Sequence, residues 1–202
     1  PDQYVHHALI QILQPRMMRS MDFYCCGSIR GRGPHQERKA IENWMAHDAK
    51  GTKYEFCGDI HHFYESLKPE VVMDRMRQLF KDRRVLDLIW RIIQNGVLIG
   101  AYTSQWFANT TLQPLDKLVR ESGLCKHYAR YMDNITVFGS NKRKLRKLRV
   151  IVEDWLNAHQ LELKSDWQVF PTVKRTEKKL LDPPRRGFER LKGSCLLYTS
   201  PS

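Results

Sequence analysis

The sequence lacks any long hydrophobic run. No apolar segment approaches the roughly 18 to 20 residues that a membrane helix needs. No basic start followed by an apolar stretch indicates a signal peptide either. We therefore expect no membrane partner and a cytoplasmic location. The first residue is Pro1 rather than methionine, from which we expect a fragment.

Cysteine is scarce and forms no recognisable pattern. The five cysteines are an odd number and include no Cys-x-x-Cys pair. This argues against a disulfide framework or a zinc site and fits a reducing compartment. Cys25 and Cys26 are adjacent, and we expect them to pack in the core rather than to react.

Acidic residues are outnumbered by basic ones, 22 to 34, which leaves a formal net charge of +12. Such a balance favours a polyanionic partner, because nucleic acid binding gains free energy from counterion release. A basic balance alone also fits solubility or attraction to a membrane surface. With 202 residues and 42% hydrophobic content, the chain can bury one sizeable core, as one domain or part of a larger one.

Residues 128–138 predict two short strands that meet at an acidic tip. Tyr, Val, Ile, Thr and Phe dominate both arms, as a packed strand pair requires. Asp133 and Asn134 form a pair that turns favour, because both residue types tolerate unusual backbone angles. We expect a hairpin with Asp133 at its bend. Taken alone, an aspartate that only satisfies its own backbone is the simpler interpretation.

A second carboxylate follows another predicted strand. Residues 54–58 alternate in the strand pattern, and Asp59 falls where the strand ends. Carboxylates at the ends of two strands can hold Mg²⁺ through oxygen ligands and leave positions open for substrate phosphates. A metal-dependent hydrolase or nuclease built on Asp59, His61 and His62 is a less favoured alternative, because no further histidine has metal-ligand spacing.

Four segments in order along the chain resemble the motifs of reverse transcriptases. Residues 59–67 resemble motif A, residues 100–109 motif B, residues 131–134 motif C and residues 160–170 motif D. In motif C, the Tyr-x-Asp-Asp box, Asn134 replaces the last aspartate. The Thr-Ser-Gln form of motif B at residues 103–105 favours the bacterial type of group II introns, retrons and diversity-generating retroelements.

The resemblance implies an α+β fold of the right-hand polymerase type. The palm is expected as an antiparallel sheet that carries both aspartates, with helices on one face, beside partial fingers and no thumb. Residues 1–52 would form the fingers-like region and residues 53–172 the palm with motifs A to D. Residues 173–202 match nothing in the family, and we expect a basic tail that is disordered or non-native.

The resemblance also implies two-metal addition of deoxynucleotides to a primer on an RNA template. Asp59, Asp133 and Asn134 would hold two Mg²⁺ ions, which Mn²⁺ can replace. Lys164 would act near the leaving pyrophosphate, although an ordinary surface lysine fits about equally well. The implied partners are an RNA template, a DNA or RNA primer and deoxynucleoside triphosphates; the sequence identifies no protein partner.

Further residues are implied to contact the nucleotide or the template. Tyr64 would lie beneath the sugar and exclude a ribose 2′ hydroxyl, although an ordinary core tyrosine is the alternative. Arg30 and Arg32 lie in a glycine-rich loop suited to phosphate contact, and solvated charges on a flexible loop fit equally well. The remaining implied contacts are His62, Phe63, Ile99, Gly100, Ser104 and Gln105.

Asn134 departs from the family pattern, because it supplies a neutral oxygen where the family has a charged one. We therefore predict reduced or retained activity rather than none. An inactive reverse-transcriptase-like protein that only binds RNA is the alternative.

Helical periodicity predicts six further elements. We expect helices from Asp2 to Leu13, from Pro34 to about His47, twice between Pro69 and Gly96, from about Ser104 to Gly123 with a kink at Pro114, and from Asn141 to His159. Basic residues crowd the start of the last helix, and this mildly favours nucleic acid contact over a merely solvated face. They are Lys142, Arg143, Lys144, Arg146, Lys147 and Arg149.

Overall fold

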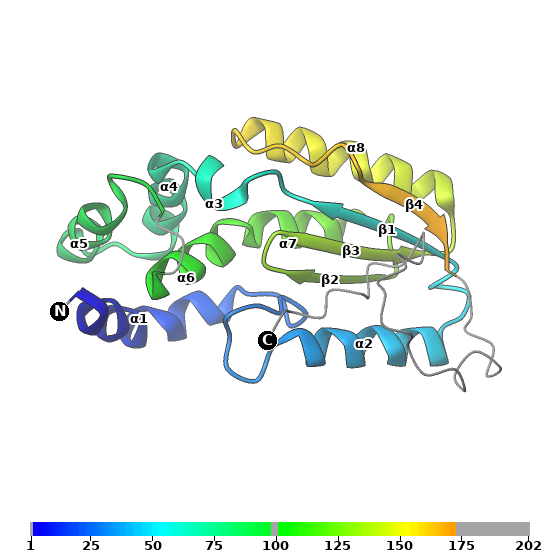
Figure 1. Cartoon of the computed structure of the whole chain (residues 1–202), viewed down its shortest axis with the longest axis horizontal. Helices are drawn as coiled ribbons and strands as arrows, with labels where there is room; N and C mark the ends of the chain where they lie inside the picture. Colours follow the sequence, from blue (N-terminus) through cyan, green and yellow to red (C-terminus); the bar gives the residue numbers. More distant parts are fainter. Residues whose placement is uncertain (1, 98–100, 173–202) are drawn as a thin grey trace, which may run out of the picture.

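A four-stranded antiparallel sheet forms the centre of the computed structural model, which describes residues 2–97 and 101–172 (Figure 1). The strands are β1 (Tyr54–Asp59), β2 (His127–Tyr131), β3 (Asn134–Gly139) and β4 (Gln168–Pro171), in the spatial order β2-β3-β1-β4. The predicted β1 strand and β2–β3 hairpin are confirmed. The expected tail at 173–202 lies outside the described residues.

The register of the strands assigns side chains to the two faces of the sheet. Phe56 of β1 opposes Val137 of β3, and both are fully buried in the main core. Asp59 opposes Asn134, so their side chains share the other face, because side chains alternate along a strand. The sheet therefore has a core face and a face that carries the predicted catalytic residues.

Helices cover the core face, as the predicted α+β class requires. The apolar side of α8 (Lys142–Ala158) packs on β1 and β3, and α7 (Gln113–Glu121) lies beside α8 and β2 (Figure 1). On the other face, α2 (Pro34–His47) packs next to β2, where Trp44 meets the ring of Phe138. The sheet is thus also partly covered on its second face, at one edge.

The first helix is longer than predicted. α1 spans Asp2–Arg19 and includes Pro15, so the expected end at Leu13 was wrong. Ile10, Leu13 and Met17 are all buried, and continuing the helix buries them on one stripe. That burial outweighs the one backbone hydrogen bond that Pro15 removes.

The segment from motif B to β2 forms two helices rather than one kinked helix. α6 spans Tyr102–Thr111 and α7 begins at Gln113. Pro114 lies in the first turn of α7, where its missing N–H would have no intrahelical partner in any case. The other predicted helices are confirmed as α2, α4 (Pro69–Leu79), α5 (Arg83–Ile93) and α8; a short α3 (Phe63–Ser66) follows β1.

Across residues 2–97 and 101–172, no helix is both long and apolar enough to cross a membrane.

Candidate active site

The turn between β2 and β3 carries Asp133. Tyr131 pairs with Asn134, so Met132 and Asp133 form the bend. Met132 has the positive backbone angle, φ 55°, and Asn134 already belongs to β3. The prediction that Asp133 and Asn134 supply the unusual angles was therefore wrong. A side chain in this left-handed region costs about 1 kcal/mol or more, so neighbouring contacts must hold the turn in place.

The buried guanidinium of Arg130 provides the strongest of these contacts. Its Nη1 donates to the Met132 carbonyl at 2.6 Å, and Nε and Nη2 donate to the two carboxylate oxygens of Asp116 at 2.7 and 2.8 Å. The side chains of Arg130 and Asp116 are 0% and 2% exposed. Tyr128 adds a hydroxyl donor to Asp116 at 2.5 Å. The ion pair is tolerated in the core because it is bidentate and further hydrogen-bonded.

Asn109 of α6 connects this turn to the loop that follows α1. Its Oδ1 accepts from Arg130 Nη1 at 3.1 Å, and its Nδ2 donates to the Gly27 carbonyl at 2.9 Å. A Cβ atom on Gly27 would lie 2.8 Å from Met132 Sδ and 3.1 Å from Met132 N, so any larger residue would have to displace the Met132 side chain and shift the turn slightly. Cys26 N also donates to the Arg130 carbonyl at 2.7 Å. The loop is therefore docked against motif C.

Asp59 and Asp133 come together at one end of the sheet. Asp59 lies opposite Asn134, and Ile60 N donates to the Asp133 carbonyl at 3.3 Å. Burial, and then the negative charge of Asp59, raises the pKa of Asp133 to about 6. Asp59 Oδ1 is buried without a hydrogen-bond partner. Two facing carboxylates with an unpartnered oxygen fit a divalent cation, which would satisfy that oxygen and relieve the repulsion.

Asn134 contributes an amide rather than a third carboxylate. Its Nδ2 donates to Asp133 Oδ1 at 3.5 Å, a contact that an ionised aspartate could not make. The substitution therefore reduces the negative charge of the site and adds a weak donor to Asp133.

Lys164 reaches Asp59 from motif D. Its ammonium forms an ion pair with Asp59 Oδ2, and its backbone N–H donates to the Asp59 carbonyl at 2.8 Å. The hydrogen bond with Asp59 raises the pKa of Lys164, so its side chain stays charged. The structure thus brings together Asp59, Asp133, Asn134 and Lys164, which the sequence predicted as one site.

Tyr64 lies beside the motif C turn. Its hydroxyl is 3.8 Å from Met132 Sδ, and burial, followed by the charge of Asp133, raises its pKa to about 12. Phe63 is buried in the core. His62 is exposed with φ 41° at the start of α3, and its ring is 3.1 Å from Glu65. Of these three side chains, only that of Tyr64 interacts with Asp133 among the described residues.

Four of the six other residues predicted to contact nucleotide or template belong to the described part of the chain. The guanidinium of Arg32 donates to the Asp22 carbonyl at 3.2 Å and lies over the Phe23 ring, whereas Arg30 is exposed. Ser104 is buried and Gln105 half-buried on α6, the helix whose Asn109 meets the turn. Their contacts with nucleotide or template stay predictions. Ile99 and Gly100 lie outside the described residues.

The histidine-based hydrolase has little support in the described part of the chain. His61 and His62 meet edge to face at 4.2 Å. Within residues 2–97 and 101–172, no group of three His, Cys, Asp or Glu side chains could hold a metal ion. A zinc site would need such a further ligand.

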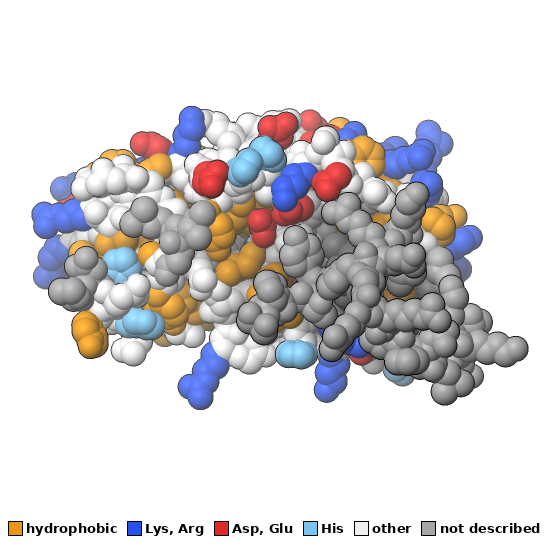
Figure 2. Space-filling model, viewed as in Figure 1, with side chains coloured by type: hydrophobic (Ala, Val, Ile, Leu, Met, Phe, Trp, Pro, Cys, Tyr) orange, Lys and Arg blue, Asp and Glu red, His pale blue; other side chains and the backbone are white. Residues whose placement is uncertain are grey.

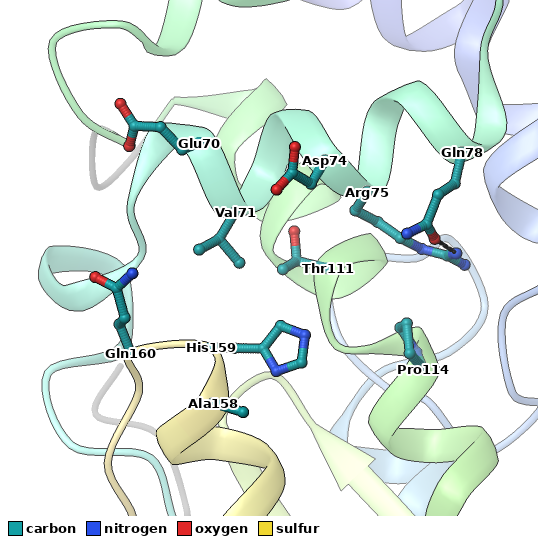
Figure 3. Close-up of a pocket in the computed structure, with 10 residues that line it drawn as sticks. All are labelled: Glu70, Val71, Asp74, Arg75, Gln78, Thr111, Pro114, Ala158, His159 and Gln160. Atoms are coloured by element: carbon teal, nitrogen blue, oxygen red, sulfur yellow. Dashed lines mark hydrogen bonds between the residues drawn. The ribbon is translucent and has the colours of Figure 1, made fainter.

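A cleft of about 380 Å³ lies elsewhere, between α4, the α6–α7 junction and the end of α8 (Figure 3). It shares no lining residue with the Asp59–Asp133 pair. The guanidinium of Arg75 at its rim is held by Gln78, Gln113 and the Thr110 carbonyl at 2.7 to 3.2 Å. Because these contacts already hold the guanidinium of Arg75, and because the cleft shares no residue with Asp59 or Asp133, we do not assign the cleft to the candidate active site.

The carboxylate pair predicts a pH-dependent loss of stability without metal. A folded-state pKa of about 6, raised from 3.8, means that the folded chain holds a proton which the unfolded chain has released. Stability therefore falls as the pH rises through this interval. We expect Asp133→Asn to be more stable than wild type at pH 7.5 and so to unfold at a higher temperature. The difference in free energy of unfolding should be on the order of 1 kcal/mol after solvent screening, and it should shrink towards pH 4.

Circular dichroism melts at several pH values, with and without 10 mM Mg²⁺, test this prediction. Mg²⁺ should raise the midpoint of the wild type at pH 7.5 and leave that of Asp133→Asn nearly unchanged. A pH-independent difference between the two chains would contradict it.

An antiparallel sheet with two strand-end carboxylates, a lysine from a third segment and helices on its core face defines a polymerase palm. The sequence matches the family described as "Reverse transcriptase (RNA-dependent DNA polymerase)" over residues 4–172. The chain therefore belongs to the reverse transcriptase family, as the motifs predicted.

Solved telomerase structures share this fold. Apo telomerase from Candida tropicalis is 12% identical with a TM-score of 0.62, over 83% of this chain and 36% of that one. Its form truncated from the C-terminal domain is 11% identical with a TM-score of 0.63, over 84% and 41%. Telomerase from Candida albicans in complex with a TWJ fragment of telomeric RNA is 12% identical with a TM-score of 0.60, over 84% and 34%. The chain thus spans less than half of each. A search of curated protein sequences found no significant match.

Sequence reasoning missed the residues that support the turn, namely Asn109, Asp116 and Arg130. A signal for them was present. Arg130 occupies an inward position of a predicted strand, between Tyr128 and the turn, and a charge there needs a buried partner. Asp116 interrupts the apolar side of its helix in the same way, beside Leu115 and Val119.

Proposed function

We propose that this chain carries the catalytic residues of an RNA-directed DNA polymerase that adds deoxynucleotides to a primer on an RNA template. The observation that carries the proposal is the facing pair of Asp59 and Asp133, with Asp59 Oδ1 buried and unpartnered, in a chain of the reverse transcriptase family. Such a pair is unfavourable without a cation and well suited to one.

Asp59 and Asp133 would hold two Mg²⁺ ions, which Mn²⁺ can replace, and the amide oxygen of Asn134 would be a weaker ligand. When bound, these ions stabilise the attacking and leaving oxygens of the in-line displacement. Lys164 keeps a positive charge next to Asp59, where it can offset charge on the leaving pyrophosphate. Arg130 holds the Met132 carbonyl and thereby fixes the turn on which Asp133 lies.

Further implied contacts belong to the same proposal. Arg30 and Arg32 would bind triphosphate or template, the segment at His62 and Phe63 would pass under the triphosphate, and Ser104 and Gln105 would line the template side. The Thr-Ser-Gln form of motif B supports a bacterial-type enzyme of a mobile element. The primer would be DNA or RNA.

Tyr64 is proposed to exclude ribonucleotides by the bulk of its ring. Its position beside Met132 and Asp133 supports this role. We expect Tyr64→Ala to raise ribonucleotide incorporation relative to deoxynucleotide incorporation by about 10- to 100-fold, since steric rejection of one small group is worth about 1–3 kcal/mol. Competing primer extensions with the two nucleotide types measure the ratio. Tyr64→Phe is the control and should keep wild-type selectivity; a ratio unchanged in Tyr64→Ala would assign the ring to the core alone.

A second candidate function is a reverse transcriptase fold retained for RNA binding. Asn134 favours it, because the site holds one carboxylate fewer than the family motif. This candidate predicts RNA binding without nucleotide addition.

Primer extension on a heteropolymeric RNA template tests the proposal. The chain is incubated with primer, four deoxynucleotides and Mg²⁺ or Mn²⁺, and the product is sequenced. DNA complementary to the template, and none without template, is the expected result. RNA binding without extension at either metal would favour the second candidate, and RNA cleavage that survives Asp133→Ala but not His61→Ala would favour a hydrolase.

A further inference from the structure

A cluster of unpaired positive charge covers the start of α8. We define the α8 basic surface as Lys142, Arg143, Lys144, Arg146 and Lys147. Four of the five are exposed and Lys142 is half-exposed. Within residues 2–97 and 101–172, none of the five has an ion-pair partner. Among the basic residues of α8 (Lys142–Ala158), only Arg149 pairs with a carboxylate, that of Glu153.

Some other exposed basic residues have such partners, whereas others within residues 2–97 and 101–172, such as Lys39, Lys68 and Arg91, are also unpaired but isolated along the chain. Arg77 pairs with Asp74 at 2.9 Å, and Arg84 with Asp82 at 3.2 Å. Arg38 and Lys117 pair with Glu42 and Glu121 at 2.8 and 3.8 Å, four residues along their helices. What distinguishes the α8 basic surface is therefore its density, five unpaired cations within six consecutive residues.

The helix places these charges where they repel. The first turn of α8 contains no acidic residue, and its cap is the neutral side chain of Asn141. The N-terminal end of a helix is itself positive, so cations there are unfavourable. Lys142 also precedes Arg146 by four positions, as Arg143 precedes Lys147, and like charges at this spacing destabilise a helix. An anionic partner would remove this repulsion.

The α8 basic surface lies away from the carboxylate pair. The opposite side of α8 is buried against the core face of the sheet through Leu145, Leu148 and Val152, whereas Asp59 belongs to the other face. α8 starts just after Gly139, which opposes Tyr54 at the far end of β1 from Asp59, about 16 Å away at roughly 3.3 Å per residue. A triphosphate at the site therefore cannot account for these charges.

Two more lysines lie near the same end of the sheet. Lys126 N donates to the Phe138 carbonyl, and Lys53 precedes Tyr54; both side chains are exposed. Figure 2 shows Lys and Arg side chains gathered at the end of the molecule where α8 begins. The positive region thus extends beyond a single helix.

We propose that the α8 basic surface binds the phosphate backbone of a structured RNA, outside the groove that holds template and primer. Polyphosphate is the partner that several adjacent ammonium and guanidinium groups fit, and Arg143 and Arg146 can each bind phosphate through two donors. An anionic membrane is less suited, because the apolar side of α8 is buried in the core and unavailable for insertion. The choice of RNA over DNA rests on the proposed function.

Neutralising the surface should weaken RNA binding and its salt dependence together. In the test variant, all five residues of the α8 basic surface are changed to Gln in the 202-residue chain. Anisotropy of a labelled RNA hairpin without primer is measured from about 50 to 200 mM salt. Each phosphate contact contributes about 0.7 to 0.9 to the slope of log K against log salt, so loss of three or more contacts should lower it by about 2 or more. Affinity at 100 mM salt should fall about tenfold or more.

A control variant removes the same charge elsewhere. It carries Gln at Arg77, Lys81, Arg83, Arg84 and Lys117, all of which are exposed. We expect its RNA affinity to stay within about threefold of wild type and its salt slope to change by less than about 1. Thermal melts should show both variants folded, with the midpoint of the α8 variant unchanged or raised because its helix loses like-charge repulsion.

Several outcomes would overturn the proposal. One is an α8 variant that binds the hairpin with the affinity and salt slope of the control variant. Another is binding of wild type to phosphatidylserine vesicles, lost in the α8 variant, while RNA binding is unchanged. A third is an equal loss of affinity for the RNA hairpin and for a DNA hairpin of the same sequence, which would mean that the surface binds nucleic acid in general rather than RNA. Primer extension is measured separately, so its absence in wild type would contradict the proposed function and leave the binding result intact.

Discussion

Asp133→Asn is expected to abolish templated nucleotide addition while leaving the fold intact. Asn is isosteric with Asp and keeps the Met132–Asp133 bend, but it removes one of the two facing carboxylates. We expect the rate to fall by about 10³-fold or more, the upper range for removal of one preorganised electrostatic group. Single-turnover primer extension measures the rate, and RNA affinity should stay near that of wild type. Extension at more than about a tenth of the wild-type rate would contradict the assignment of Asp133 to the site.

Asn134→Asp is the matched variant in the opposite direction. It restores the charge of the family motif opposite Asp59 and removes the amide contact to Asp133 Oδ1. We expect a faster rate and a lower Mg²⁺ concentration for half-maximal activity, because a carboxylate is a stronger ligand for Mg²⁺ than an amide oxygen. The metal-free chain should be less stable at pH 7.5, since three carboxylates then face one another. An unchanged rate would mean that the second position of motif C does not limit nucleotide addition by this chain.

Asp116→Ala is expected to destabilise the chain by about 3–5 kcal/mol, because it leaves the charge of Arg130 buried without its partner. Both side chains are almost fully buried, and Tyr128 would lose its acceptor as well. Urea unfolding followed by circular dichroism measures the loss. Lys117→Ala is the control, because it breaks an exposed ion pair on the same helix, which contributes at most about 1 kcal/mol. A loss below about 1 kcal/mol in Asp116→Ala would show that the pair is not buried as described.

The double variant Asp116→Leu with Arg130→Met separates stability from positioning. Replacing both members of a buried ion pair by apolar residues is often neutral or stabilising, so the double variant should recover most of the lost stability. It still lacks the donor to the Met132 carbonyl that fixes the turn of Asp133. We therefore expect a folded chain that binds RNA and adds nucleotides about 10²-fold more slowly, as a misplacement of about 1 Å can cause. A double variant with the wild-type rate would assign the pair to stability alone.

Part of the fold followed from local pattern. The alternation of residues 54–58, the β-rich arms around Asp133 and the helical stripes of α2, α4, α5 and α8 were enough to predict these elements. Such patterns are readable because burial on one face of a strand or helix imposes a fixed period. Two helix boundaries were predicted wrongly for the same reason. The packing of Met17 extends α1 past Pro15, and the break between α6 and α7 depends on which segments these helices pack against. A local pattern holds no information about such packing partners.

The sequence by itself determined which residues could form the site, because the motifs specify residue types in a fixed order. Asp59, Asp133, Asn134 and Lys164 were all found in this way, and the structure brings them together. Only the tertiary structure decided how Asp133 is held. The Arg130–Asp116 pair joins a strand to a helix 14 residues earlier, and Asn109 joins the turn to Gly27, 82 residues away in the chain. Whether a charge is buried and which partner it meets depend on packing between distant segments, and a single sequence does not encode that packing in any local period.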